Sequence, residues 1–144
     1  MPKWDAHQRY DSPYAAIIPN FISGALHNSD LNIYGTGEQT RDFIHVSDAI
    51  DAHLLADKHT VTGSFNVGTG RSTSILTIAQ LVQSLEGRGK IVFSEPRPGD
   101  AASSCADITK IARLLAFTPK IYVENGIKEL YYHHKKQLTQ SSVS

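Results

Sequence analysis

Two loops in this sequence each combine an arginine, a glycine and a carboxylate. The first carries Arg41 shortly after Gly35-Thr36-Gly37, and the second reads Arg97-Pro98-Gly99-Asp100. A guanidinium group offers a planar fork of donors that suits phosphate oxygens, and glycine lets a backbone approach a ligand closely. A nearby aspartate can accept hydrogen bonds from the hydroxyl groups of ribose or a sugar. Together these residue types predict a site for a nucleoside diphosphate joined to a sugar.

The properties of the whole chain narrow the choice of function. Its 144 residues suffice for one domain with a hydrophobic core. The formal net charge is zero, so no overall field favours nucleic acid or an anionic membrane, and no apolar segment reaches transmembrane length. Cys105 is the only cysteine, so we expect no disulfide within the chain, a cytoplasmic location and a packed thiol. The seven histidines lack a ligand framework, so no metal site is predicted.

Hydrophobic periodicity predicts a mixed α/β fold. The expected helices begin near Ser12 (with a kink at Pro19), Ser47, Thr73 or Ser74, Asp107 and Glu124. Short strands are expected at 31–34, 43–46, 64–67 and 91–93. These strands are few and short for a complete doubly wound sheet. We therefore divide the chain into an irregular segment, 1–11, a single domain, 12–138, and a disordered tail, 139–144.

Four motifs carry a resemblance to a known family. They lie at 33–48, 66–70, 97–100 and 106–108, in that order, within a likeness that extends from about Gln8 to Lys136. The chain resembles extended short-chain dehydrogenase/reductases that act on nucleotide sugars, and within them the UDP-glucose 4-epimerase-like, NAD-dependent epimerase/dehydratases. The resemblance implies the C-terminal, substrate-binding part of such an enzyme, without the N-terminal Rossmann half that holds NAD.

The resemblance also assigns roles to individual residues. By motif match, Arg41 and Arg97 would contact the pyrophosphate from two sides, and Asp100 would bind the ribose hydroxyls. The strand that contains Ile33 and Tyr34 would lie along the base. These five residues are the predicted substrate-binding site.

Structural alternatives remain for the same residues. Arg41 and Asp42 could form a local ion pair that closes a turn. Arg97 and Asp100 could serve simply to order a loop rich in proline and glycine. Tyr34 could pack in the core.

Two further residues are expected to serve the scaffold. By motif match, Asp48 and Asn66 would serve the scaffold.

The catalytic motifs of the family have no counterpart in the chain. Its glycine-rich NAD motif and its Tyr-x-x-x-Lys pair are absent from the expected places, so no catalytic residue and no cofactor site is assigned, although NAD serves the full-length family. Tyr131 and Lys135, like Tyr132 and Lys136, have the right spacing, but they lie on the last predicted helix, where a solvated or core-edge role is expected. The turn at 68–70 imitates a dinucleotide fingerprint incompletely.

We therefore expect a nucleotide-sugar-binding domain, with a UDP sugar as the first candidate, from an isomerase-type enzyme and inactive as an isolated chain. The alternative is a non-catalytic module that self-associates or acts as a scaffold. In the family this region packs on the Rossmann domain, so Ile50, Leu54, Phe65 and Val67 would lack neighbours here. The expected partners are a nucleotide sugar and either a second copy or a separate Rossmann domain, with no nucleic acid and no membrane.

Overall fold

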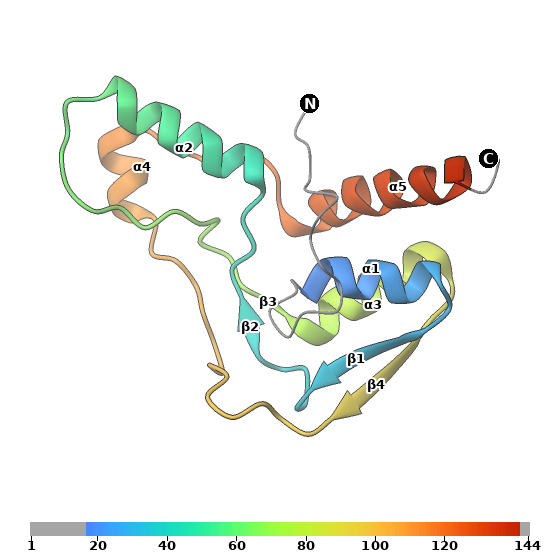
Figure 1. Cartoon of the computed structure of the whole chain (residues 1–144). Coiled ribbons are helices and arrows are strands. Elements are labelled where there is room, and N and C mark those ends of the chain that lie inside the picture. Colours follow the sequence, from blue (N-terminus) through green and yellow to red (C-terminus); the bar gives the residue numbers. More distant parts are fainter. Residues whose placement is uncertain (1–16, 142–144) are drawn as a thin grey trace.

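The computed structural model describes residues 17–141, which form a mixed α/β fold (Figure 1). The elements are α1 (Ile17–Leu26), β1 (Asp30–Tyr34), β2 (Thr40–Arg41), α2 (Val46–Lys58), β3 (Thr73–Ser74), α3 (Ile75–Glu86), β4 (Lys90–Ser94), α4 (Thr109–Leu115) and α5 (Val123–Ser141). The predicted mixture of helices and short strands is confirmed. None of the helices described between Ile17 and Ser141 combines the length and apolar character needed to cross a bilayer.

The main core lies between three helices, α1, α3 and α5, and the parallel strand pair β1–β4. Strand β1 sends Leu31 and Ile33 inward, and both are fully buried. At the carboxyl end of the pair, Tyr34 lies beside Ser94. The helices contribute the buried apolar residues Phe21, Ile22, Ala25, Ile75, Ile78, Ala79, Val82, Ile127, Leu130 and Tyr131.

Helix α3 has the boundaries that its sequence predicts. The Ser74 hydroxyl accepts a hydrogen bond from the backbone N–H of Thr77 at 3.1 Å and caps the amino end. Gly87 ends the helix with a φ of 71°, in the left-handed region that glycine adopts without steric penalty.

Helices α2 and α4 lie apart from α1 and α3 in Figure 1, and they share a second, smaller core. It consists of the buried residues Ala52, Ile111, Leu115 and Phe117. The buried Asp48 of α2 accepts hydrogen bonds from the backbone N–H groups of Lys120 at 3.0 Å and Ile121 at 2.9 Å. These bonds hold the segment before α5 against α2, so the scaffold role expected of Asp48 is confirmed.

A narrow ribbon of three segments lies between the two cores, around β2 (Figure 1). Strand β2 pairs antiparallel with β3, where Arg41 lies beside Thr73. On the other side, the Thr40 N–H donates to the Ala102 carbonyl at 3.0 Å, and the Ser104 N–H donates to the Thr40 carbonyl at 3.1 Å. Thus the segment 40–42 is flanked by β3 and by the chain that follows β4.

Two of the predicted strands are wrong. Residues 43–45 are irregular, and α2 begins at Val46 with His45 as its N-cap, because His45 Nδ1 accepts from the Ser47 N–H at 3.2 Å. Residues 64–67 do not form a strand, and they pair with none of the strands described between residues 17 and 141. A strand requires a partner, and none of the four described strands lies alongside 64–67.

The ends of the domain also differ from the prediction. Helix α1 is continuous from Ile17 to Leu26, so Pro19 does not split it. Helix α5 runs through Ser141, so residues 139–141 of the predicted disordered tail are helical, because the run of good helix formers before them sustains the helix. The predicted segment 1–11 lies outside the described residues.

Candidate functional site

Arg41, at the end of β2, reaches the loop that follows β4. Its Nη2 donates to the carboxylate of Asp100, and its Nη1 donates to the carbonyl of Ala101 at 2.7 Å. The Arg41 side chain is 26% exposed and that of Asp100 is 41% exposed. The ion pair is therefore open to solvent, and an anion can approach the guanidinium group.

Arg97 lies in the same loop and stacks on Tyr34. Its Cζ is 3.9 Å from the centre of the tyrosine ring, where the electron-rich face attracts a cation. The Asp100 N–H donates to the Arg97 carbonyl at 3.3 Å and closes the turn between them. One turn thus connects the stack of Arg97 on Tyr34 with the ion pair of Asp100 and Arg41.

The predicted site residues divide into two groups. Tyr34, Arg41, Arg97 and Asp100 come together around this single turn, although they derive from separate segments. Ile33 does not join them, because its side chain is fully buried in the main core. Successive residues of a strand point to opposite faces, so Tyr34 turns outward where Ile33 turns inward. The Ile33 side chain is a core residue.

Asp42 does not form the local ion pair considered for it, since Arg41 pairs with Asp100. One Asp42 oxygen accepts from the Thr69 hydroxyl at 2.5 Å and the Thr69 N–H at 2.9 Å. The other accepts from the Gly70 N–H at 3.0 Å and the Ala106 N–H at 3.2 Å. We call Asp42, Thr69, Gly70 and Ala106 the Asp42 clasp.

The electrostatics of the clasp favour an ionised aspartate. Burial opposes the charged form, but the hydrogen bonds from Thr69, Ala106 and Gly70 outweigh it and hold the pKa of the Asp42 carboxyl below its usual value. The clasp also accounts for the glycine-rich turn at 68–70. In a dinucleotide site the N–H groups of Thr69 and Gly70 would face a phosphate, whereas here they donate to Asp42. The turn is therefore structural.

Cys105 borders the clasp at the surface. Its side chain is exposed, so the packed position predicted for it is wrong. The segment 104–107 faces 65–67 across an open groove. Because this segment runs along the surface, the Cys105 thiol is in contact with solvent.

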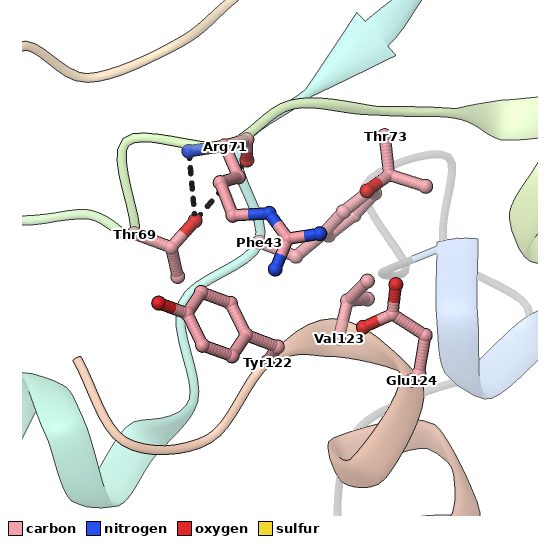
Figure 2. Close-up of a pocket in the computed structure, with 7 residues that line it drawn as sticks. All are labelled: Phe43, Thr69, Arg71, Thr73, Tyr122, Val123 and Glu124. Atoms are coloured by element: carbon pink, nitrogen blue, oxygen red, sulfur yellow. Dashed lines mark hydrogen bonds between the residues drawn. The ribbon is translucent and has the colours of Figure 1, made fainter.

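A shallow pocket lies between the loop after the clasp and the start of α5 (Figure 2). The Arg71 Cζ lies 4.6 Å from the centre of the Tyr122 ring, and the Arg71 N–H donates to the Thr69 hydroxyl at 3.2 Å. The pocket is small, with a cavity volume of about 10 Å³, and is lined by Phe43, Thr69, Arg71, Thr73, Tyr122, Val123 and Glu124. No short motif predicts it, because its residues come from three distant segments.

Tyr131 and Lys135, which imitate a catalytic pair, link α5 to α3. Lys135 Nζ donates to the Tyr131 hydroxyl at 2.9 Å and to the Glu86 carboxylate at 3.0 Å, and the Tyr131 hydroxyl donates to Glu86. Burial raises the pKa of Tyr131, and its hydrogen bond to Glu86 raises it further. A tyrosine that takes up protons as a general base needs a lowered pKa. The buried Tyr131 and the exposed Lys135 agree with the core-edge role expected for this helix.

The chain is similar in sequence and in fold to known proteins. Residues 6–68 match the model of the NAD dependent epimerase/dehydratase family. Over 91% of the chain, the structure is similar to UDP-glucose 4-epimerase from Thermotoga maritima, with a TM-score of 0.85 and 32% sequence identity. The chain belongs to the NAD-dependent epimerase/dehydratase family. The UDP-glucose 4-epimerase-like, extended short-chain dehydrogenase/reductase resemblance predicted from four motifs is thereby confirmed.

Two curated relatives show the same affiliation. The chain is 38% identical over 127 residues to UDP-N-acetyl-α-D-glucosaminuronate decarboxylase from Bacillus cytotoxicus, covering 83% of this chain and 40% of the relative. It is 35% identical over 117 residues to a putative UDP-glucose 4-epimerase from Methanocaldococcus jannaschii, covering 81% and 38%. The chain thus spans about two fifths of the length of these relatives, and 42% of the Thermotoga epimerase chain.

Proposed function

We propose that the chain is the nucleotide-sugar-binding part of an NAD-dependent sugar epimerase/dehydratase and that its ligand is a UDP sugar. The observation that carries this proposal is the turn that brings Arg41, Arg97 and Asp100 together. A guanidinium group on this turn and a second one that reaches it from β2 suit the two phosphates of a nucleoside diphosphate. The names of the matched relatives, which include UDP-sugar epimerases and a decarboxylase, support UDP as the nucleotide.

The ion pair between Arg41 and Asp100 gives the binding event a defined order of contacts. A diphosphate that reaches Arg41 replaces the Asp100 carboxylate as its acceptor. The released carboxylate then accepts hydrogen bonds from the ribose hydroxyls. Arg97, held on Tyr34, faces the diphosphate from the other side of the turn.

The chain would hold the substrate without transforming it. NAD, bound by another part of the enzyme, would supply hydride transfer at the sugar, and a separate Rossmann domain is the partner that this division requires. Charged contacts to the diphosphate leave the hexose free to turn. The isolated chain is therefore proposed to be inactive. Separately, a cytoplasmic location for the protein stays a prediction.

Calorimetric titration tests the binding proposal. UDP-glucose should bind the purified chain, with GDP-mannose and dTDP-glucose as competitors for base preference. Arg41→Ala and Arg97→Ala should each lower the affinity about tenfold or more, since a charge-assisted hydrogen bond contributes about 1.5–3 kcal/mol. Arg113→Ala, a change at an exposed arginine on α4, serves as the control. A folded chain that binds none of these sugars would refute the proposal, and epimerase turnover by the chain alone would refute its inactivity.

A second candidate function is a self-associating or scaffolding module. It is favoured by the outer face of α2, where Ile50 is 49% exposed and Leu54 is 52% exposed. Phe65 and Val67 were predicted to lack neighbours, as were Ile50 and Leu54. In the structure Phe65 and Val67 are partly buried against the second core. Association of the chain without any nucleotide-sugar binding would favour this candidate.

A further inference from the structure

The segment 40–42 is the middle of the three-segment ribbon, and its side chains serve two purposes. Arg41 reaches forward to Asp100 and the Ala101 carbonyl. Asp42, the next residue, turns to the loops on both flanks, with Thr69 on one side and Ala106 on the other. Arg41, which is proposed to face the ligand, and Asp42, which bonds to the segments on both flanks, are therefore adjacent residues.

The clasp acts on the loop that carries the other site residues. Ala106 follows Asp100 and Ala101 by only a few positions, so the bond from the Ala106 N–H to Asp42 fixes one end of the segment that Arg41 contacts. The Thr40 bonds to Ala102 and Ser104 continue the same register. A shift of this segment would move the Asp100 carboxylate and the turn that ends at it.

The clasp is also tightly packed. A Cβ atom placed on Gly68 would lie 2.7 Å from an Asp42 carboxylate oxygen and 2.6 Å from the Ala106 Cβ. Such distances are far below ordinary contact, so only glycine fits where the carboxylate, the turn at 68–70 and residue 106 meet. The carboxylate has little freedom to move independently of the two loops.

From these contacts we infer that Asp42 is a positioning residue for the proposed diphosphate site. It acts on the ligand through Arg41 and through the loop that follows the Arg97–Asp100 turn. Asp42 itself does not touch the ligand. The inference rests on the proposed function for its effect on binding, whereas the fastening of the loop can be measured without a ligand.

A double-mutant cycle with UDP measures the effect on binding. Asp42→Asn keeps the shape of the side chain but replaces one acceptor oxygen with a donor, and it should weaken UDP binding about tenfold in the wild-type background. In the Arg41→Lys background, which retains residual binding, the same change should cost less than about twofold, because coupled residues are not additive. An equal loss in both backgrounds, or no loss at all, would overturn the inference. General damage to the fold would give the equal loss.

Hydrogen exchange of the ligand-free chain measures the fastening itself. In Asp42→Asn the amides of Thr40 and Ser104, bonded across the ribbon, should exchange at least about tenfold faster, while those of Ile78 and Val82 in the core of α3 stay unchanged. Unchanged exchange at Thr40 and Ser104 would overturn the inference. A wild-type chain that binds no UDP but shows the faster exchange would refute the proposed function and leave the fastening role in place.

A milder variant covers the case in which Asp42→Asn does not fold. Thr69→Val preserves the size of the side chain and keeps the backbone bond to Asp42, but it removes the hydroxyl bonds to Asp42 and to the Arg71 backbone. It should produce the same pattern at about one third of the size, in UDP affinity and in exchange at Thr40 and Ser104. Absence of both effects in a folded Thr69→Val chain would overturn the inference.

Discussion

Arg41 and Asp100 form an ion pair across 59 positions of the sequence, which fastens β2 to the loop after β4. The pair joins the two loops that the sequence singled out. It also means that the cation proposed to bind phosphate already has an anionic partner before a ligand arrives. Binding is then an exchange of one anion for another, and its consequences can be measured.

Asp100→Asn should separate phosphate binding from nucleoside binding. The neutral amide competes less for Arg41, so inorganic pyrophosphate should bind about two to five times more tightly, the equivalent of about 0.5–1 kcal/mol for an exposed pair. UDP-glucose should gain less, because the amide offers the ribose a single neutral acceptor oxygen in place of a charged carboxylate. Calorimetry of both ligands tests this, with Asp57→Asn on the exposed part of α2 as the control. An equal gain for both ligands would contradict a ribose role for Asp100.

Arg97→Lys should weaken UDP-glucose binding although it conserves the charge. Lysine lacks the planar fork that stacks on Tyr34 and presents two parallel donors. We expect a loss of about tenfold, which is about 1.4 kcal/mol. Arg113→Lys, far from the turn in sequence and exposed, should leave the affinity unchanged. Wild-type affinity in Arg97→Lys would show that the stack does not matter for binding.

Glu86→Gln should destabilise the fold in a pH-dependent manner. The side chain is 6% exposed, and hydrogen bonds from Tyr131 and then Lys135 hold the pKa of its carboxyl below the usual value. Its contribution is therefore present above the pKa of glutamate in the unfolded chain and is lost as pH falls through the lower folded-state value. Urea unfolding at pH 7 should show a loss of about 1–3 kcal/mol.

Urea unfolding of Glu86→Gln and wild type at several pH values tests whether the charge of Glu86 is responsible. The difference between Glu86→Gln and wild type should shrink below about pH 4, where glutamate becomes protonated. Glu38→Gln, at an exposed position, is the matched control and should change little at any pH. A difference that stays constant down to pH 3 would contradict a role for the charge.

Tyr131→Phe should affect stability and leave ligand binding intact. The hydroxyl links Glu86 to Lys135 inside the contact between α3 and α5, so its removal should cost about 1 kcal/mol of the free energy of unfolding. UDP-glucose affinity should be unchanged within error by calorimetry. A selective loss of affinity without a change in stability would indicate that this tyrosine belongs to a ligand site.

The double substitution Ile50→Ser and Leu54→Ser should reduce self-association of the chain. Both side chains are about half exposed on one helix and form the apolar surface expected to need a partner. Light scattering coupled to size-exclusion chromatography should show a concentration-dependent mass for the wild type and a monomer for the variant. Phe93→Ser, an exposed apolar position on β4, is the control. A wild type that stays monomeric at high concentration would contradict the prediction.

Local sequence predicted those parts of the fold that local interactions determine. The cap at Ser74, the stop at Gly87 and the strands around Leu31 and Ile91 all follow from residues a few positions apart. Residues 43–46 and 64–67 have strand-like composition, yet strand formation depends on a neighbour that lies elsewhere. Composition alone could not show that this neighbour is missing from the described elements.

The candidate site shows the same division. Arginine, glycine and aspartate in two loops were sufficient to select Arg41, Arg97 and Asp100, and the structure places them around one turn. The alternation along β1 could have excluded Ile33, whose apolar neighbour two positions earlier already indicated an inward face. The role of Asp42 could not be predicted, because its partners lie 27 and 64 positions away.

The exposed thiol of Cys105 has a practical consequence. It is the sole cysteine of the chain and adjoins Ala106, whose N–H binds Asp42. A maleimide fluorophore would therefore attach at one known place without any engineered substitution. Its emission would follow the loop as nucleotide is added, which makes the unaltered protein its own optical reporter.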